Sequence, residues 1–301
     1  MAQSGKATPK HSKTAGSAEI ASRDNRWLKQ FRAALSGDRG GDGPIGVEGF
    51  RLVEAALGSG LHIEALLASN SGERHLSRVA HLLENGANIL RTSDRLFAGI
   101  SDTQAPQGIA ALVRPRKTVL ENLIGPSALV IVLAGVQDPG NVGTILRAAE
   151  AFGATGAATC SANSVGTADP LGPKALRASA GSVLRLPVLH GEPTAALLPR
   201  LHAAGLKIYA AIAATGENTE KSSHPASPLL RPWEADWKSP SALLIGNEGA
   251  GLPDEIVRAA DARVTIPQAA ATTPIGVESL NAAMAATVLL YEAMRQRNAR
   301  R

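Results

Sequence analysis

The chain has 301 residues, of which 44% are hydrophobic and 19% are charged, a composition that excludes a globally disordered protein. No apolar stretch reaches the roughly 18 residues of a membrane span, and the first residues lack the apolar run of a secretory signal. A single cysteine, Cys160, excludes an internal disulfide framework and a multi-cysteine zinc site. These observations predict a soluble, cytoplasmic protein that does not act at a membrane.

The first part of the chain predicts a small α/β domain. Residues 1–22 are rich in Ser, Ala, Thr and Lys and have no apolar periodicity, which indicates a disordered basic tail. A helix is expected from about Asp24, whose side chain could cap it, to about Leu35. Further helices are expected at 49–57, 73–84 and 94–100, and strands at 63–68, 88–90 and 108–113. This alternation predicts a domain at 23–117, followed by a linker at 118–126.

The second part predicts an open, mostly parallel sheet flanked by helices, whose ligands bind at the carboxyl ends of the strands. The continuous apolar run at 128–134 is typical of a buried parallel strand. Further strands are expected at 157–160, 183–188, 207–213, 242–245 and 263–266, and helices at 142–152, 173–180, 194–204, 253–259 and 278–297. The polar, proline-containing residues 215–240 predict a mobile surface loop.

The positive charge is concentrated in the first part. Residues 1–117 carry 16 Lys and Arg against 11 Asp and Glu, a net charge of +5, whereas residues 118–301 carry 15 of each. A basic lobe beside a neutral one is typical of a protein that binds a polyanion with one half and carries out chemistry with the other. The same excess also fits an ordinary surface, so both interpretations stay open at this point.

Several familiar site chemistries are absent from the sequence. The glycines from Gly246 onward follow a GxxGxG spacing, not the GxGxxG of dinucleotide folds, and no GxxxxGK[ST] motif occurs. The seven histidines form no HExxH pair, and there is no GxSxG elbow. Cys160 ends an expected strand and is interpreted as a small buried hydrophobe. No metal site is predicted.

Three segments that each follow an expected strand carry glycines and polar residues. They are DPGNVGTILR at 138–147, GNEGAGLP at 246–253, and the segment that begins at Pro267 and ends in ESLNAA at 278–283. Through these segments and the linking residues 173–181, the sequence resembles the SpoU (TrmH-like) family of RNA ribose 2′-O-methyltransferases, a branch of the SPOUT methyltransferases. Residues 47–53 and 101–108 resemble the ribosomal-protein-like RNA-binding domain of that family.

The resemblance implies a fold and a cofactor. It predicts a knotted (trefoil) α/β methyltransferase domain at 127–301, preceded by a smaller α/β ribosomal-protein-like domain. The implied methyl donor is S-adenosylmethionine, whose chemistry needs no metal. Its expected binding residues lie at strand ends and at the start of the last helix: Leu244, Gly246, Asn247, Gly251, Ile266, Pro267, Leu280 and Asn281. Residues 268–277 form a longer segment than we expect in this family.

The expected catalytic residues are Arg147, Asn141, Glu248, Ser279 and Asn281. Asn141 and Arg147 are six residues apart and should share one helix face. In the family the matching arginine is proposed as the base for the ribose hydroxyl. Arginine normally stays protonated, so clamping phosphate and stabilising the alkoxide is physically easier, and both roles stay open.

The other expected catalytic residues also have structural interpretations. Glu248 could orient Arg147 or the ribose through charge-assisted hydrogen bonds, or it could place negative charge at the start of the next helix. Ser279 is a candidate N-cap of the last helix. Ser279 and Asn281 could both hydrogen-bond the ligand or RNA.

The expected substrate is structured RNA, with ribosomal RNA favoured over transfer RNA because look-alikes of the front domain mostly belong to rRNA enzymes. Aromatic residues make up only 3% of the chain, so phosphate and shape contacts are expected in place of base stacking. The basic residues considered for these contacts are Arg26, Lys29, Arg32, Arg51, Arg114, Arg116 and Lys117, with the tail at 295–301 as a further candidate.

The resemblance also implies a homodimer with active sites beside the interface. The last helix presents a largely apolar stripe that suits helix packing, namely Leu280, Met284, Thr287, Val288, Tyr291 and Met294. Three other functions remain possible from the sequence alone: a tRNA 2′-O-methyltransferase, a non-catalytic RNA-binding protein of ribosome assembly with the same fold, and an α/β enzyme that uses another nucleotide.

Overall fold

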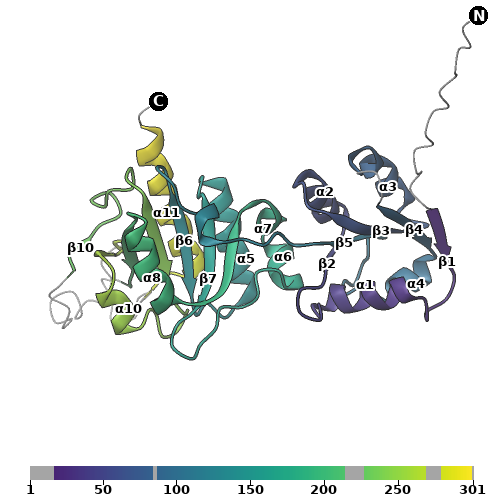
Figure 1. The fold of residues 1–301 in the computed structure, drawn as a ribbon, viewed down its shortest axis with the longest axis horizontal. Coiled ribbons are helices and arrows are strands. Elements are labelled where there is room, and N and C mark those ends of the chain that lie inside the picture. Colours follow the sequence, from purple (N-terminus) through teal and green to yellow (C-terminus); the bar gives the residue numbers. More distant parts are fainter. Residues whose placement is uncertain (1–16, 84–86, 214–226, 269–278, 300–301) are drawn as a thin grey trace, which may run out of the picture. The chain divides into compact units, whose positions relative to one another are not determined.

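Two sheets, each covered by helices, organise the chain as two units, Met1–Pro115 and Arg116–Arg301 (Figure 1). The computed structural model describes residues 17–83, 87–213, 227–268 and 279–299. No helix within these ranges is long and apolar enough to cross a membrane. Each unit has its own cluster of buried apolar side chains.

The first unit is a mixed sheet between two layers of helices. Its elements are β1 (Ser17–Ile20), α1 (Arg26–Ser36), β2 (Ile45–Glu48), α2 (Phe50–Gly58), β3 (Ile63–Ser69), α3 (Glu73–Val79), the 3-10 turn η1 (Ala80–Leu82), β4 (Asn88–Thr92), α4 (Asp94–Ala98) and β5 (Ile109–Val113). The strand order is β1-β4-β3-β5-β2, with β5 antiparallel to both of its neighbours. Helices α1 and α4 cover one face and α2 and α3 the other (Figure 1).

The predicted disordered tail is wrong for residues 17–20, which form β1. This strand pairs in parallel with β4, Ile20 is buried, and the Thr92 hydroxyl donates to the Ile20 carbonyl at 3.0 Å. A short edge strand takes its hydrogen bonds from a distant part of the chain, so local composition does not reveal it. Residues 1–16 of the predicted tail lie outside the described residues.

Helix α1 begins slightly later than predicted. Its N-cap is Asn25, whose Oδ1 accepts a hydrogen bond from the Trp27 N–H at 2.9 Å, and not Asp24. Asn and Asp are about equally good N-cap residues, so two adjacent candidates cannot be separated by type alone.

The second unit is an all-parallel sheet, in agreement with the prediction of an open, mostly parallel α/β fold. Its elements are the 3-10 turn η2 (Leu120–Asn122), β6 (Leu129–Ala134), α5 (Pro139–Ala151), β7 (Gly156–Ser161), α6 (Pro173–Ala178), α7 (Ser182–Arg185), β8 (Val188–Pro193), α8 (Thr194–Ala203), β9 (Lys207–Ala211), β10 (Leu229–Leu230), β11 (Ser241–Ile245), α10 (Asp254–Arg258), β12 (Ala262–Val264) and α11 (Ala282–Asn298). The strand order is β10-β12-β9-β11-β6-β7-β8, and every pair is parallel.

The core of this unit explains why β6 is apolar throughout. Val130 and Val132 of β6 share one buried cluster with Leu197 of α8 and Ile256 of α10. Helix α5 contacts α6, α7 and α11. Cys160 lies in the same cluster at 2% exposure, and burial raises its pKa to about 12, as a small buried hydrophobe should behave.

The strand predicted at 183–188 is wrong in its first half. Residues 182–185 form α7, which follows Gly181 in a left-handed conformation (φ 85°) and packs on α5, and β8 starts only at Val188. The run at 183–188 is short and contains two valines and two leucines, which fit a buried helical turn as well as a strand. Hydrophobic periodicity alone therefore could not distinguish a helix from a strand here.

The surface loop predicted at 215–240 is also wrong where the structure describes it, from residue 227 onward. Trp237 is fully buried, its indole N–H donates to the Pro232 carbonyl at 2.8 Å, and its ring lies 4.6 Å from that of Tyr209. One buried tryptophan therefore anchors a polar, proline-containing segment to the sheet. Residues 214–226 lie outside the described residues.

We predict that Gly143→Ala lowers the free energy of unfolding by about 1–3 kcal/mol, since overpacking a tight contact costs this much. A Cβ at Gly143 would strike the Ala175 carbonyl oxygen and lie 2.7 Å from the Ala178 Cβ, because α5 and α6 meet closely there. Urea unfolding measures the loss. Gly166→Ala is the matched control, because a Cβ there meets nothing within 4 Å. Equal stability of the two variants would contradict the close α5–α6 contact.

Candidate functional site

The candidate site lies where loops leave the carboxyl ends of parallel strands. β6 and β11 are neighbouring parallel strands, so the loop before α5 and the loop after β11 begin side by side. The third predicted segment reaches the same place at Asn281, the N-cap of α11, a helix that packs against α5. The structure therefore brings together residues from all three predicted segments.

Asn247 ties the loop after β11 to the loop after β6. Its Nδ2 donates to the Gly135 carbonyl at 3.0 Å, and its Oδ1 accepts from the N–H groups of Gly249 and Ala250, each at 2.9 Å. All of these contacts are within the chain, and the backbone of Asn247 also pairs with that of Gly251 in both directions, at 3.1 and 2.9 Å, so Asn247 shapes the loop.

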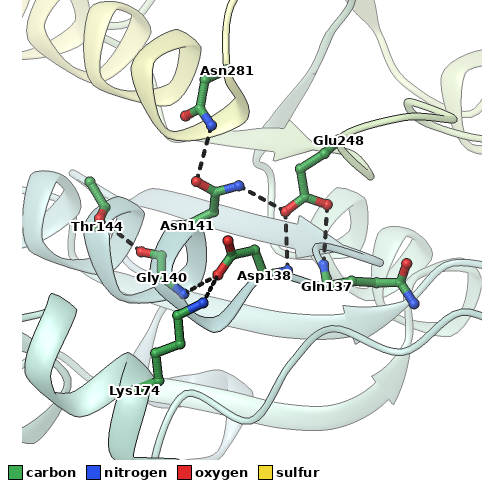
Figure 2. Close-up of polar contacts among 8 residues, drawn as sticks. All are labelled: Gln137, Asp138, Gly140, Asn141, Thr144, Lys174, Glu248 and Asn281. Atoms are coloured by element: carbon green, nitrogen blue, oxygen red, sulfur yellow. Dashed lines mark hydrogen bonds and ion pairs between the residues drawn. The ribbon is translucent and has the colours of Figure 1, made fainter.

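Glu248 joins the same loop to the start of α5 (Figure 2). Its carboxylate accepts hydrogen bonds from the backbone N–H groups of Gln137 and Asp138, each at 3.2 Å, and from Asn141 Nδ2 at 2.9 Å. Partial desolvation would raise the pKa of Glu248, but these hydrogen bonds outweigh it and hold the pKa below its ordinary value. Glu248 is therefore ionised at neutral pH and acts as a clamp.

Asn141 extends the clamp to the last helix (Figure 2). Its Oδ1 accepts a hydrogen bond from Asn281 Nδ2 at 3.1 Å, while its own Nδ2 serves Glu248. Asn281 in turn caps α11, because its Oδ1 accepts from the N–H groups of Ala283 and Met284. The hydrogen-bonded line Glu248–Asn141–Asn281 links the three segments. Asn141 is more than 100 residues away in sequence from each of its two partners.

The sequence reasoning missed Asp138 and Lys174. Asp138 is the N-cap of α5, and its Oδ1 accepts from the Gly140 N–H at 2.6 Å and from Lys174 Nζ of α6 at 2.9 Å (Figure 2). The hydrogen bonds from Lys174 and Gly140 lower the pKa of Asp138. An Asp directly before a proline is an N-cap signal and could have identified Asp138. Nothing local in the sequence points to Lys174.

Arg147 is exposed on α5, and the structure does not bring it to Glu248. Among the described residues, none forms a hydrogen bond or ion pair with its guanidinium. Thr144 lies three residues after Asn141 and three before Arg147, and it is also exposed. Its hydroxyl donates a hydrogen bond to the Gly140 carbonyl at 2.8 Å. A cation on the exposed side of this helix, near the clamp and without an internal partner, is available to an anionic ligand.

The expected cofactor residues lie near the carboxyl ends of β11 and β12 or directly before α11. Leu244 is fully buried in the core cluster, so its side chain packs inside the protein. A Cβ at Gly246 would lie 2.5 Å from the Gly251 carbonyl carbon, and Gly251 has a φ of 69°, so this loop closes only with glycine at both positions. The remaining three are half-buried and apolar: Ile266, Pro267 and Leu280.

Two expectations about the carboxyl-terminal part are corrected. Ser279 is not the N-cap of the last helix: it is exposed and lies two residues before the true cap. In the described part of the tail predicted at 295–301, Arg295 pairs with Glu292, and Arg297 donates to the carbonyls of Ser127, Ala128 and Trp237, so these two side chains are less available than expected. Arg300 and Arg301 lie outside the described residues. The long segment at 268–277 lies outside the described residues from 269 onward.

Within the described residues, no group of three or more His, Cys, Asp or Glu side chains is placed to hold a metal ion. The described residues of the site offer amide and carboxylate hydrogen bonds, glycine backbone and exposed cations. These groups suit an organic ligand and an anionic substrate.

Models of known protein families match both units of the chain. The model of the SpoU rRNA Methylase family matches residues 128–291, and the model of the MRM3-like substrate binding domain matches residues 37–111.

Relatives match over most of their length. The chain is 31% identical to the 23S rRNA (uridine(2479)-2′-O)-methyltransferase of Streptomyces viridochromogenes, over 95% of this chain and 94% of that protein. It is 30% identical to the 23S rRNA (guanosine(2553)-2′-O)-methyltransferase RlmP of Bacillus subtilis, over 81% and 86%. The crystal structure of the AdoMet-bound rRNA methyltransferase from Sinorhizobium meliloti superimposes with a TM-score of 0.74 at 30% identity, covering 93% of this chain and 98% of that one.

We predict that the stability difference between the wild type and Glu248→Gln depends on pH. A carboxylate whose pKa is lowered by folding stabilises the protein fully above its unfolded pKa of about 4.3, and that contribution disappears as the pH falls through the folded pKa. Thermal unfolding of both proteins from pH 7 to pH 2.5 measures it. A difference that stays constant over this range would show that the Glu248 charge is not what holds the loops.

Proposed function

The chain belongs to the SpoU rRNA methylase family, and we infer from this that it transfers a methyl group from S-adenosylmethionine to a ribose 2′-hydroxyl of ribosomal RNA. The observation that carries the inference is the line Glu248–Asn141–Asn281, which joins the three loops at one strand edge. Two relatives are named as 23S rRNA 2′-O-methyltransferases, which favours ribosomal over transfer RNA. Because those relatives act on bacterial ribosomal RNA, we propose that this chain works in the cytoplasm.

The residues at this edge fit S-adenosylmethionine, which supplies an electrophilic methyl group on a sulfonium when bound. A Cβ at Gly251 would meet nothing within 4 Å, so open backbone space exists beside the loop. We propose that the half-buried Ile266, Pro267 and Leu280 form apolar walls for the ligand and that the strand-end backbone from Leu244 to Gly246 hydrogen-bonds its polar edge. The amide of Asn281 completes the site from α11.

We propose that Arg147 clamps phosphate and stabilises the ribose alkoxide. Its exposed guanidinium offers several N–H donors in a planar array that matches anionic oxygens. A guanidinium is a permanent cation, which suits the role of electrostatic clamp, whereas the role of base would need a neutral side chain. Glu248 acts on the reaction as a positioning residue, since it holds Asn141 and the loop before α5. Ser279 is exposed ahead of α11 and is proposed to contact the RNA or the ligand.

Two finer features of the fold are also proposals. We propose that the second unit is a trefoil knot, which membership of the SpoU family supports, with α11 returning from the end of the chain to pack on α5. The first unit is a ribosomal-protein-like RNA-binding domain. Its match to a substrate binding domain and the excess of positive charge in residues 1–117 support this role.

We further propose a homodimer that forms through α11. The helix buries Ala283, Ala286, Leu289, Leu290 and Ala293 within its own unit. Much of the predicted apolar stripe is instead exposed: Met284 is 62%, Tyr291 51% and Val288 43% exposed. Exposed apolar side chains in a row on one helix mark an interaction surface, and a second copy of the same helix offers a self-complementary partner.

Arg147→Ala should lower methyl transfer about 100-fold or more, while the affinity for S-adenosylmethionine stays near that of the wild type. The assay follows labelled methyl groups from S-adenosylmethionine into ribosomal RNA and maps the 2′-O-methylated nucleotide. Arg147→Lys, which keeps the charge but loses the planar array, should retain an intermediate rate.

Three results would contradict this assignment. An Arg147→Ala variant that lost cofactor binding but kept turnover at saturation would remove Arg147 from the reaction. Methyl transfer to transfer RNA alone would change the substrate. A wild type that bound ribosomal RNA without transferring methyl groups would make the protein a non-catalytic RNA binder.

Val288→Asp should convert the dimer into a monomer without unfolding it, since the side chain is exposed in the single chain and charge is costly only in an apolar interface. Sedimentation at micromolar concentration measures the mass, and Asn298→Asp at an exposed polar position of α11 is the control.

Mixing Arg147→Ala with Asn281→Ala subunits tests whether sites are shared, because mixed dimers should then recover part of the activity. A monomeric wild type would defeat the proposal.

A further inference from the structure

The exposed face of α1 carries positive charge and no negative charge. The helix Arg26–Ser36 contains no Asp or Glu, and its cations Arg26, Lys29 and Arg32 are all exposed. They follow one another at spacings of three, so they lie along one side of the helix. The opposite side, with Leu28 and Phe31, is buried in the core of the first unit.

The charges are placed against the helix dipole. The positive end of the dipole is at the N-terminus, where acidic residues stabilise a helix and basic residues destabilise it. In α1 the first turn holds Arg26 and no acid, and the last turn holds no basic residue. The helix dipole therefore does not explain why a cation stands in the first turn.

These cations are also weakly engaged inside the protein. Lys29 is 3.5 Å from Asp24, whose side chain is 91% exposed, and a pair this open contributes little. Arg26 lies over the ring of Trp27 at 5.4 Å. No described residue forms a hydrogen bond or ion pair with Arg32.

The opposite helical layer of the same unit is different. Arg51 of α2 is followed by Glu54 one turn later, and Arg78 of α3 packs over the Phe50 ring at 4.1 Å. Arg74 of α3 donates to His75 at 3.4 Å. This layer also contains two acids, Glu54 of α2 and Glu73 of α3, whereas α1 contains none, so its net positive charge is smaller than that of α1.

We propose that the exposed face of α1 is the surface with which the first unit grips the phosphodiester backbone of its RNA substrate. The proposal rests on the proposed function, and it commits to one of the two helical layers of the unit. A row of cations along a helix suits consecutive phosphates and carries no sequence readout, so α1 supplies affinity and orientation for the RNA while other contacts select the nucleotide.

The test compares two triple variants of the full-length protein. In the first, Arg26, Lys29 and Arg32 are each changed to Gln. In the matched control, Arg51, Arg74 and Arg78 are each changed to Gln, which removes the same charge from the opposite layer. Binding to a ribosomal RNA transcript is measured across a range of salt concentrations, together with S-adenosylmethionine affinity and thermal unfolding.

The α1 variant should bind RNA about tenfold to a hundredfold more weakly at 0.1 M salt, and the slope of log affinity against log salt should fall by about 2. The control should keep a slope close to that of the wild type. The melting temperature of the α1 variant should stay the same or rise, because the removed charges oppose the dipole. Cofactor affinity should not change in either variant.

An α1 variant with the wild-type slope would overturn the inference, and so would a control that loses as much as the α1 variant. If the wild type methylates ribosomal RNA in either case, the proposed function stands and only the assignment of the surface fails. A wild type that neither binds nor methylates ribosomal RNA would overturn both.

Discussion

The rest of the site depends on the hydrogen bonds that the Glu248 carboxylate accepts. Three donors reach it, two from the backbone before α5 and one from Asn141, and Asn141 passes the connection on to Asn281. Glycines surround Glu248 and leave the loop free to approach the neighbouring strand end, but they also make it costly to order. The charged hydrogen bonds offset that cost, so the chain itself holds these loops together.

Helix α11 connects this site to the surface. Its N-cap is the last member of the hydrogen-bond line, its alanine-rich side packs inside the unit, and its Met284, Val288 and Tyr291 face outward. In the proposed dimer, the second copy would contact the same helix whose N-cap hydrogen-bonds Asn141 of the candidate site. In the first unit, α1 divides its two sides in the same way, with a buried apolar side and a cationic outer side.

The sequence by itself determined the parallel sheet, most of the helices and the three segments of the site. The apolar run of β6 is long enough to demand burial on both faces, and the glycine spacing after β11 demands a tight loop. These signals are local, so they survive without knowledge of the rest of the fold. Asn141, Glu248 and Asn281 could be named because the segments that contain them resemble SpoU motifs, although their mutual contacts could not.

The tertiary structure decided everything that depends on a partner far away in the chain. Residues 17–20 became a strand because β4 offers an edge, and Trp237 pulled a polar segment into the fold because Tyr209 and a carbonyl receive it. It also assigned Glu248 to Asn141 and not to Arg147, and it paired Lys174 with Asp138. Burial and hydrogen-bond geometry select among residues of equal local propensity, and both exist only once the chain has folded.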